Sequence, residues 1–351
     1  MEIRTLQFDE EPALLELLEG HPPVDGQPAR KLLERRIAHD PTYGPEQVIV
    51  AVDHGRLLGC IVIVPRPLLV LGHRIPTAGL SQLYVEPDAR KQGFARALVE
   101  QASVAMRERG VELSIVFPPI PELFEAQGWQ CWTGQRAILR STEKGIAPRG
   151  AIASTDTVEL DLFDADTERG LSAIQAIHSA YSASRHGTVI RDDDLWRASL
   201  QLAGNPQEEI WIARRGGLAV AYARVAVLDE VLTVTEMGRF EDGAGALAKL
   251  VRSLLEPRED DPLATGGRSS EAVRDFLVLP TFDDIGLTVG LEHEGTSSHP
   301  MEDRRARIRC LNLNALAARL DVELLDGETP EAFLERILPP DGFVFWPADR
   351  F

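Results

Sequence analysis

The chain has 351 residues, of which 44% are hydrophobic and 26% charged, and its net charge is −18. This composition is typical of a soluble globular protein and excludes a membrane-embedded, collagen-like or wholly disordered chain. Residues 151–300 carry 13 basic and 26 acidic side chains, whereas residues 1–150 carry 17 and 19. We therefore expect no nucleic acid and no anionic membrane as partner, because phosphate binding needs concentrated lysine and arginine.

No apolar run is long enough for a transmembrane helix, and the first residues contain no apolar segment typical of a secretory signal. The three cysteines, at positions 60, 131 and 310, lie far apart and form no CxxC pair. No two histidines have HxxxH spacing. These patterns predict a cytoplasmic protein with reduced thiols and without a metal site.

Residues 1–141 alternate strand and helix patterns and predict a first α/β domain. Its expected strands are residues 1–6, 47–52, 57–64, 67–70, 74–85, 111–117 and 129–139. Its expected helices are residues 10–19, 29–39, 93–108 and 121–126.

Residues 142–156 are polar and rich in glycine and proline, and we interpret them as a linker. A second unit over 157–300 repeats the order of the first, with expected strands at 158–162, 209–214, 217–227 and 231–240 and helices at 171–182, 194–202, 245–254 and 270–276. Residues 301–351 predict a short C-terminal segment with a strand at 306–313, helices at 312–320 and 329–338, and an aromatic tail. The expected fold class is α/β, with α+β mixed sheets in two tandem units.

One segment carries recognisable chemistry. An apolar strand ends at Val85, a turn with Pro87 follows, and the next residues, before a helix, are Arg90, Lys91, Gln92, Gly93, Phe94, Ala95 and Arg96. Such a turn aims backbone N–H groups at one point, and the helix N-terminus adds its positive dipole end. The basic side chains stand where they can surround a diphosphate, in a chain with only four lysines.

The spacing Val85-x-Pro87-x-x-Arg90-x-x-Gly93-x-Ala95 resembles the acetyl-CoA signature of the GNAT superfamily of N-acetyltransferases. The residues from Leu71 to Ser81 are similar to tandem-GNAT acetyltransferases of the enhanced intracellular survival type. The resemblance implies a GNAT fold in each unit, with the CoA pyrophosphate on the loop from Arg90 to Arg96 and the pantetheine on the main chain of Leu83, Tyr84 and Val85. Proteins of this type have a third, C-terminal part, which is much shorter in this sequence. The resemblance therefore implies a possible homo-oligomer but no particular number of subunits.

The counterpart of this loop in the second unit is Gly238–Gly245. It keeps glycines, but Glu241 and Asp242 stand where a diphosphate would bind. Because like charges repel, we expect a second unit without CoA that shapes the substrate cleft.

Acetyl transfer to an amine needs a base for the amine proton and an acid for the departing thiolate. Many GNAT enzymes place a tyrosine as acid four residues before a glycine, and the matching position here holds Phe124, before Gly128. In enzymes of the enhanced intracellular survival type, a C-terminal phenylalanine carboxylate is thought to act as base, which maps to Phe351. The apolar tail before Phe351 predicts docking back onto the protein, either in the active site or only to close a core. Ser81 is a candidate substrate contact or an ordinary strand serine.

The leading hypothesis is an acetyl-CoA-dependent N-acetyltransferase for an amine of a small molecule or peptide. The alternative is a non-catalytic acyl-CoA-binding or sensing protein, indicated by Phe124. The acidity of residues 151–300 favours a cationic amine, if those carboxylates face the cleft.

Overall fold

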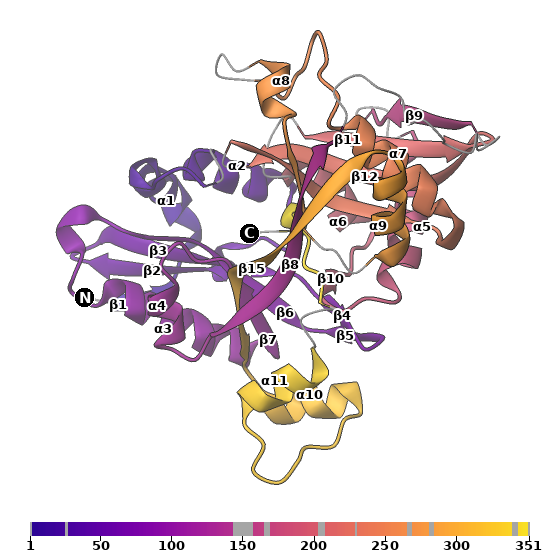
Figure 1. Cartoon of the computed structure of the whole chain (residues 1–351). Coiled ribbons are helices and arrows are strands. Elements are labelled where there is room, and N and C mark those ends of the chain that lie inside the picture. Colours follow the sequence, from indigo (N-terminus) through magenta and orange to yellow (C-terminus); the bar gives the residue numbers. More distant parts are fainter. Residues whose placement is uncertain are drawn as a thin grey trace.

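The computed structural model describes residues 2–24, 27–142, 157–164, 169–202, 208–228, 230–264, 269–280, 284–338 and 343–349. Through them runs one 12-stranded mixed sheet with helices on its faces (Figure 1). The expected mixed α/β class is confirmed. The predicted linker lies outside the described residues apart from Thr142.

The first unit follows the sequence pattern closely. Its strands are β1 (Glu2–Thr5), β2 (Val48–Asp53), β3 (Arg56–Pro65), β4 (Leu68–Val70), β5 (His73–Ile75), β6 (Thr77–Val85), β7 (Leu113–Val116) and β8 (Gln130–Ser141). Its helices are α1 (Glu11–Leu17), α2 (Ala29–His39), α3 (Phe94–Glu108) and α4 (Pro121–Glu125). The single strand expected over 74–85 is two strands, β5 and β6, which separate at Pro76 because proline has no N–H for a ladder.

The rest of the chain adds seven strands and seven helices within the described residues. The strands are β9 (Val158–Leu162), β10 (Thr188–Val189), β11 (Glu209–Arg215), β12 (Leu218–Leu228), β13 (Val231–Arg239), β14 (Leu277–Leu279) and β15 (Thr296–Cys310). The helices are α5 (Leu171–Ser182), α6 (Asp193–Leu202), α7 (Ala244–Ser253), α8 (Ser270–Val273), α9 (Ile285–His293), α10 (Leu313–Leu320) and α11 (Pro330–Ile337).

Three elements of this half had no sequence prediction: β10, β14 and α9. The helix expected over 270–276 ends at Val273, and its last residues lead into β14. Helix α9 contains Gly286 and Gly290, which weaken helix propensity. A Cβ on Gly290 would stand 2.7 Å from the Cβ of Ala248, so glycine there lets α9 pack closely on α7.

The two units exchange their closing strands. The sheet order is β1-β2-β3-β6-β7-β15-β8-β14-β13-β12-β11-β9. Strand β15, late in the chain, pairs with β7 of the first unit, and β8, from the first unit, pairs with β14 of the second. The long β8 and β15 also pair with each other through the middle of the molecule (Figure 1). The exchange therefore joins both units into one continuous sheet.

Strand β15 corrects the strand that we expected over residues 306–313. It begins at Thr296 and runs across residue 300, where the second unit was expected to end. Its first half is polar and contains Pro300, which argues against a strand when the segment is considered alone. The partner β8 supplies the ladder there, with Pro300 opposite Ala137.

Helices cover both faces of each half of the sheet. In the first unit, α3 packs on one apolar cluster and α1 and α2 on another. In the second unit, α7 and α9 cover one cluster, which also contains Trp346 of the tail, and α5 and α6 contribute to another. The expectation that the tail docks back onto the protein is confirmed for its described part, because Trp346 is fully buried.

A small second sheet, β10-β4-β5, joins the units a second time. Residues Thr188 and Val189 of the second unit extend the β4–β5 hairpin of the first. Beside it, the N–H of Leu71 donates to Nδ1 of His186 at 3.1 Å, and the N–H of Val344 in the tail donates to the His186 carbonyl at 2.7 Å. His186 thus connects the hairpin, the second unit and the tail.

Candidate active site

The parallel strands β6 and β7 separate after three residue pairs. Their register runs from Thr77 opposite Leu113 to Gly79 opposite Ile115, while β6 stays paired with β3 as far as Val85. In the described part of the chain, the edge of β6 that faces β7 has no partner strand beyond Gly79. Its main-chain N–H and C=O groups can therefore bind an extended ligand that lies between the strands.

A β-bulge lies within this diverging part of β6. At Gln82 the ladder to β3 shifts register, and Gln82 has a left-handed φ of 49°. Its side-chain amide donates to the carbonyl of Ala29, at the start of α2, at 2.9 Å. Bulges bend a strand and often occur next to active sites. The sequence analysis missed Gln82, because no local pattern indicates a glutamine in this conformation.

The loop after β6 presents main-chain N–H groups to solvent. Lys91 and Gly93 have left-handed φ values of 62° and 89°, and α3 begins directly afterwards at Phe94. No side chain caps this helix N-terminus, so the first N–H groups of α3 keep their capacity to donate. With the positive end of the helix dipole, the loop is an anion site of the kind predicted from its sequence.

The basic side chains of the loop are available for an anion. Arg90, Lys91 and Arg96 are exposed, and none has a carboxylate partner among the described residues. The Nε of Arg90 donates to the Val85 carbonyl at 3.0 Å, and its guanidinium carbon lies 5.9 Å from the Tyr84 ring centre. Arg90 is therefore held at the end of β6 while its charge remains unpaired.

The other predicted residues divide between the two faces of β6. Leu83, Val85, Phe94 and Ala95 pack in the cluster under α3, whereas Tyr84 packs on the opposite face with α1 and α2. Ser81 is half-buried and opposes Val62 on β3. Continuing the β6–β7 register beyond Gly79 would bring Ser81 opposite Phe117, across the divergence of the two strands.

The side chain of Phe124 belongs to the core. It is buried and contacts Trp129 edge to face, with ring centres 5.5 Å apart. A phenyl ring in this place has no proton to give to a thiolate. Three of the four tyrosines in the chain are occupied elsewhere: their hydroxyls donate to Glu11, Asp284 and Glu236.

The equivalent loop of the second unit differs in conformation and in pairing. Strand β13 is parallel to β14 at Thr233 and Val278, but the loop after β13 lacks the left-handed turn, since Gly243 has φ −85°. Arg239 is paired with Asp284, the N-cap of α9, through two hydrogen bonds of 2.8 Å. Asp242 pairs with Arg215. These contacts favour the expected second unit without CoA.

The described part of the C-terminal tail contacts both units. The Phe345 ring contacts Phe117, just beyond β7, with centres 5.5 Å apart. The turn Pro347–Asp349 packs against β13, and Asp349 forms a 2.7 Å ion pair with Arg191. Phe351, the predicted base, lies outside the described residues.

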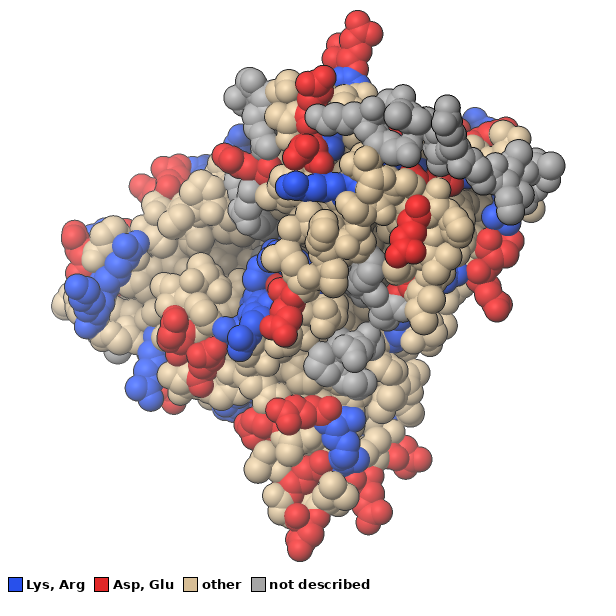
Figure 2. Space-filling view, viewed as in Figure 1, with Lys and Arg blue, Asp and Glu red and all other residues tan. Residues whose placement is uncertain are grey.

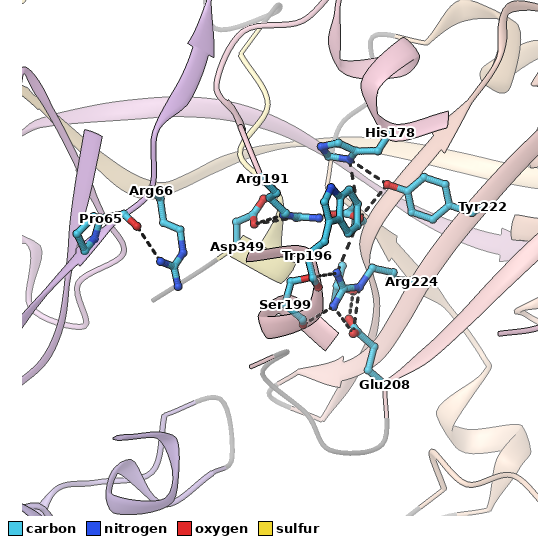
Figure 3. Close-up of polar contacts among 12 residues, drawn as sticks. Pro65, Arg66, His178, Arg191, Trp196, Ser199, Glu208, Tyr222, Arg224 and Asp349 are labelled. Atoms are coloured by element: carbon cyan, nitrogen blue, oxygen red, sulfur yellow. Dashed lines mark hydrogen bonds and ion pairs between the residues drawn. The ribbon is translucent and has the colours of Figure 1, made fainter. Parts of the chain in front are cut away.

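A buried polar network receives the tail in the second unit (Figure 3). Arg191 bonds both Asp349 and Glu236, and the hydroxyl of Tyr222 donates to Glu236 at 2.8 Å and lies 3.0 Å from Nδ1 of His178. Burial alone would raise the pKa of Glu236, but Arg191 and Arg224 hold that pKa well below its usual range. Burial lowers the pKa of His178. These shifts favour an ionised Glu236 beside a neutral His178 imidazole.

We expect the free energy of unfolding to fall as the pH drops below about 6.5, the ordinary histidine pKa. Burial lowers the pKa of His178 and of His186, so the unfolded state binds more protons in this range and stability is lost as pH falls. Urea unfolding from about pH 7.5 to about pH 5.5 measures the slope. His54→Gln is the control, because His54 is almost fully exposed, and this variant should keep the slope of the unmodified protein. An unfolding free energy of the unmodified protein that does not change with pH over this range would contradict the prediction.

No group of three or more histidine, cysteine or carboxylate residues in the described ranges is arranged to hold a metal ion. None of the helices seen there combines the length and apolarity needed to cross a bilayer.

Comparison with known proteins agrees with this geometry. Residues 2–131 match the acetyltransferase (GNAT) domain family. A probable N-acyltransferase from Enterococcus faecalis superposes with a TM-score of 0.67 at 16% identity, covering 91% of this chain and 74% of that one. Eis1 from Mycobacterium abscessus superposes with a TM-score of 0.59 at 18% identity, and the match covers 97% of this chain and 82% of that one. Saccharomyces cerevisiae N-myristoyltransferase with bound myristoyl-CoA superposes with a TM-score of 0.51 at 11% identity; the match covers 87% of this chain and 78% of that one. A search of the curated proteins finds no match.

The diverging strands, the loop before α3 and the family match together identify a GNAT-type domain in the first unit, and proteins of that domain family use acyl-CoA donors. Residues 2–131 thus match the acetyltransferase (GNAT) domain family, and the overall fold is similar to those of the Enterococcus faecalis protein and of Eis1.

Proposed function

We propose that this protein is an acetyl-CoA-dependent N-acetyltransferase that acts on an amine of a small molecule or peptide. The observation that carries the proposal is the open anion site at the end of β6, where exposed Arg90, Lys91 and Arg96 surround the uncapped N-terminus of α3. Buried arginines such as Arg66, Arg191 and Arg224 are, in contrast, already paired with carboxylates. An uncompensated basic loop beside diverging strands suits a nucleotide diphosphate with an extended arm.

The residues present fit CoA along its length. The diphosphate would take the N–H groups of the loop and the side chains of Arg90, Lys91, Gln92 and Arg96. We expect the pantetheine to bond the main chain of β6 around Leu83, Tyr84 and Val85, on the side away from β3, which would bring the thioester toward the bulge and Ser81. Gly93 allows the left-handed turn of the loop, and Phe94 and Ala95 pack beneath it in the cluster under α3.

The reaction needs few groups from the protein. The amine nitrogen attacks the thioester carbon, the C–N bond forms and the C–S bond breaks. We assign the amine proton to the terminal carboxylate of Phe351 and place Ser81 as a substrate contact. The thiolate then takes its proton from water, since Phe124 has none to give. Burial of a carboxylate raises its pKa, which would suit a buried terminal carboxylate to act as such a base.

We propose a cationic amine as acceptor, because the chain has a net charge of −18. The buried network by the tail has three carboxylates, of Glu208, Glu236 and Asp349, against the two guanidiniums of Arg191 and Arg224. On the face drawn in Figure 2, other acidic side chains are scattered and form no single patch. The attraction would therefore come from the tail region and not from a broad acidic surface.

The three cysteines are all unbridged, which supports our placing of the protein in the reducing cytoplasm.

A second candidate is a non-catalytic acyl-CoA-binding or sensing protein. The buried Phe124 favours it, since the usual acid is missing. The two are separated by measuring free thiol released from acetyl-CoA over a panel of amines. Amine-dependent release supports the acetyltransferase, whereas acetyl-CoA binding without release over the whole panel supports the sensor and overturns the enzyme.

A further inference from the structure

We propose that Gln82 is a positioning residue, whose side-chain amide fixes the bulge of β6 against the start of α2. The bulge lies in the part of β6 toward which the thioester is expected to extend, so this contact sets where the acyl group stands. The inference rests on the proposed function, because it assumes that an acyl-CoA lies along β6.

The backbone of Gln82 has a conformation that few residues other than glycine adopt. Its φ is 49°, and the register shift between β3 and β6 leaves Gln82 and Leu83 together opposite Ile61. A left-handed conformation is unfavourable for a residue with a side chain, and it persists only where the surrounding contacts maintain it. The contacts of Gln82 therefore decide the shape of β6 at this point.

Two hydrogen bonds maintain this conformation. Nε2 of the side chain donates to the Ala29 carbonyl at 2.9 Å, and Ala29 is the fully buried first residue of α2. The Gln82 carbonyl accepts from the Cys60 thiol at 3.5 Å. Burial raises the pKa of that thiol to about 12, so it keeps the proton that it donates. Because α2 also packs on α6 of the second unit, the amide fixes the bulge relative to both units.

The burial of this amide is costly, which argues for a role beyond packing. Gln82 is only 5% exposed, and its Oε1 is buried without a partner among the described residues. A buried polar atom without a partner lowers stability, and a methionine side chain would fill a similar space without that cost. What the glutamine adds over methionine is the bond from Nε2 to α2.

The position of the bulge along the open edge of β6 gives this bond its importance. Beyond Gly79, the edge of β6 toward β7 has no partner strand in the described part of the chain. The second unit offers a comparison, because β13 also has a bulge, at Thr235. Thr235 has no left-handed φ, and the loop after β13 lacks the left-handed turn. The left-handed bulge with its bond to a helix thus occurs in the unit that has the open anion site.

The test compares two variants that remove this bond in different ways. Gln82→Met keeps the length of the side chain but has no donor, whereas Gln82→Asn keeps an amide and suits a left-handed φ but is too short to reach Ala29. We expect both to lower kcat about 10- to 100-fold, because a reacting group displaced by about 1 Å can lose a hundredfold in rate. The KM and the dissociation constant for acetyl-CoA should not change, because the loop from Arg90 to Arg96 is intact.

Thr77→Val is the matched control, at the other end of the same strand. The Thr77 hydroxyl is buried and donates to the Ile75 carbonyl at 3.2 Å, so this variant also loses a buried side-chain hydrogen bond of β6, but away from the bulge. Its kcat should equal that of the unmodified protein. A kcat in both Gln82 variants no lower than in this control, or a loss of acetyl-CoA affinity as large as the loss of kcat, would overturn the positioning role.

Hydrogen exchange of residues 79–85 provides a readout that does not need turnover. We expect Gln82→Met to speed exchange in this segment at least about tenfold and to leave the rest of the chain unchanged. Unchanged exchange would show that the amide does not fix the bulge and would overturn the inference even in an active enzyme. Absence of amine-dependent turnover in the unmodified protein would instead overturn the proposed function, and the positioning role in acetyl transfer would fail with it.

Discussion

Deletion of Phe351 is expected to lower kcat by about 100- to 10,000-fold, the range that a general base contributes. The deletion moves the terminal carboxylate back by one residue, away from the acceptor amine. The affinity for acetyl-CoA should not change, because the loop from Arg90 to Arg96 and the main-chain edge of β6 lie in the first unit and do not involve the terminus. Steady-state kinetics with a reactive amine, together with the dissociation constant for acetyl-CoA, measure both quantities.

Two further variants separate the carboxylate from the side chain that carries it. Phe351→Leu keeps a terminal carboxylate at the same position and should retain most of kcat. Adding two glycines after Phe351 keeps the side chain but displaces the carboxylate, and it should lose as much kcat as the deletion. Turnover that survives both the deletion and the extension would remove the terminus from the mechanism.

The double charge reversal Arg90→Glu with Arg96→Glu is expected to weaken acetyl-CoA binding about 100-fold or more. Each charge-assisted hydrogen bond to phosphate contributes about 1.5–3 kcal/mol, and the new carboxylates repel the diphosphate. Both side chains are exposed, so the fold should remain intact. Equilibrium dialysis with labelled acetyl-CoA measures the dissociation constant.

The matched control is Arg107→Glu, a reversal at the other end of α3. Arg107 is exposed and lies in the last turn of the helix, far along the helix axis from the loop. The affinity of the Arg107→Glu variant for acetyl-CoA should stay within about twofold of that of the unmodified protein, since the interactions of exposed charges more than about 10 Å apart are screened. A double reversal at 90 and 96 that binds as tightly as this control would remove the loop from the CoA site.

Local sequence patterns predicted most individual elements. Helix α2 at Ala29–His39 and strand β9 at Val158–Leu162 have the predicted bounds, because their apolar spacing and flanking turn residues are encoded within a few positions. The exchange of β8 and β15 was beyond such patterns. Which strand lies next to β7 depends on pairing between residues far apart in the chain, and the polar first half of β15 has no strand signal of its own.

The site shows the same division. The loop from Arg90 to Arg96 was found because its conformation depends on neighbouring residues, above all Gly93 with its left-handed φ. Gln82 and the Arg191–Asp349 pair were not found. The partners of that pair are separated by 158 positions, and only the folded chain brings them together. The assignment of a catalytic role to Phe351 came from family resemblance, and it stays a prediction.

The structure also shows which acidic side chains of the second unit are already paired with arginines. Several of its carboxylates, including Asp261 and Asp284, are buried in ion pairs with arginines and are therefore not available to a ligand. The prediction of an acidic cleft therefore narrows to the region around Asp349, where buried carboxylates outnumber guanidiniums.

Calorimetric titration of acetyl-CoA into the unmodified protein shows whether the chain has one acyl-CoA site and whether this site is in the first unit. We expect one site per chain, with the binding heat lost in the variant reversed at Arg90 and Arg96. Absence of binding heat at high protein concentration, or a second site that persists in that variant, would contradict this expectation.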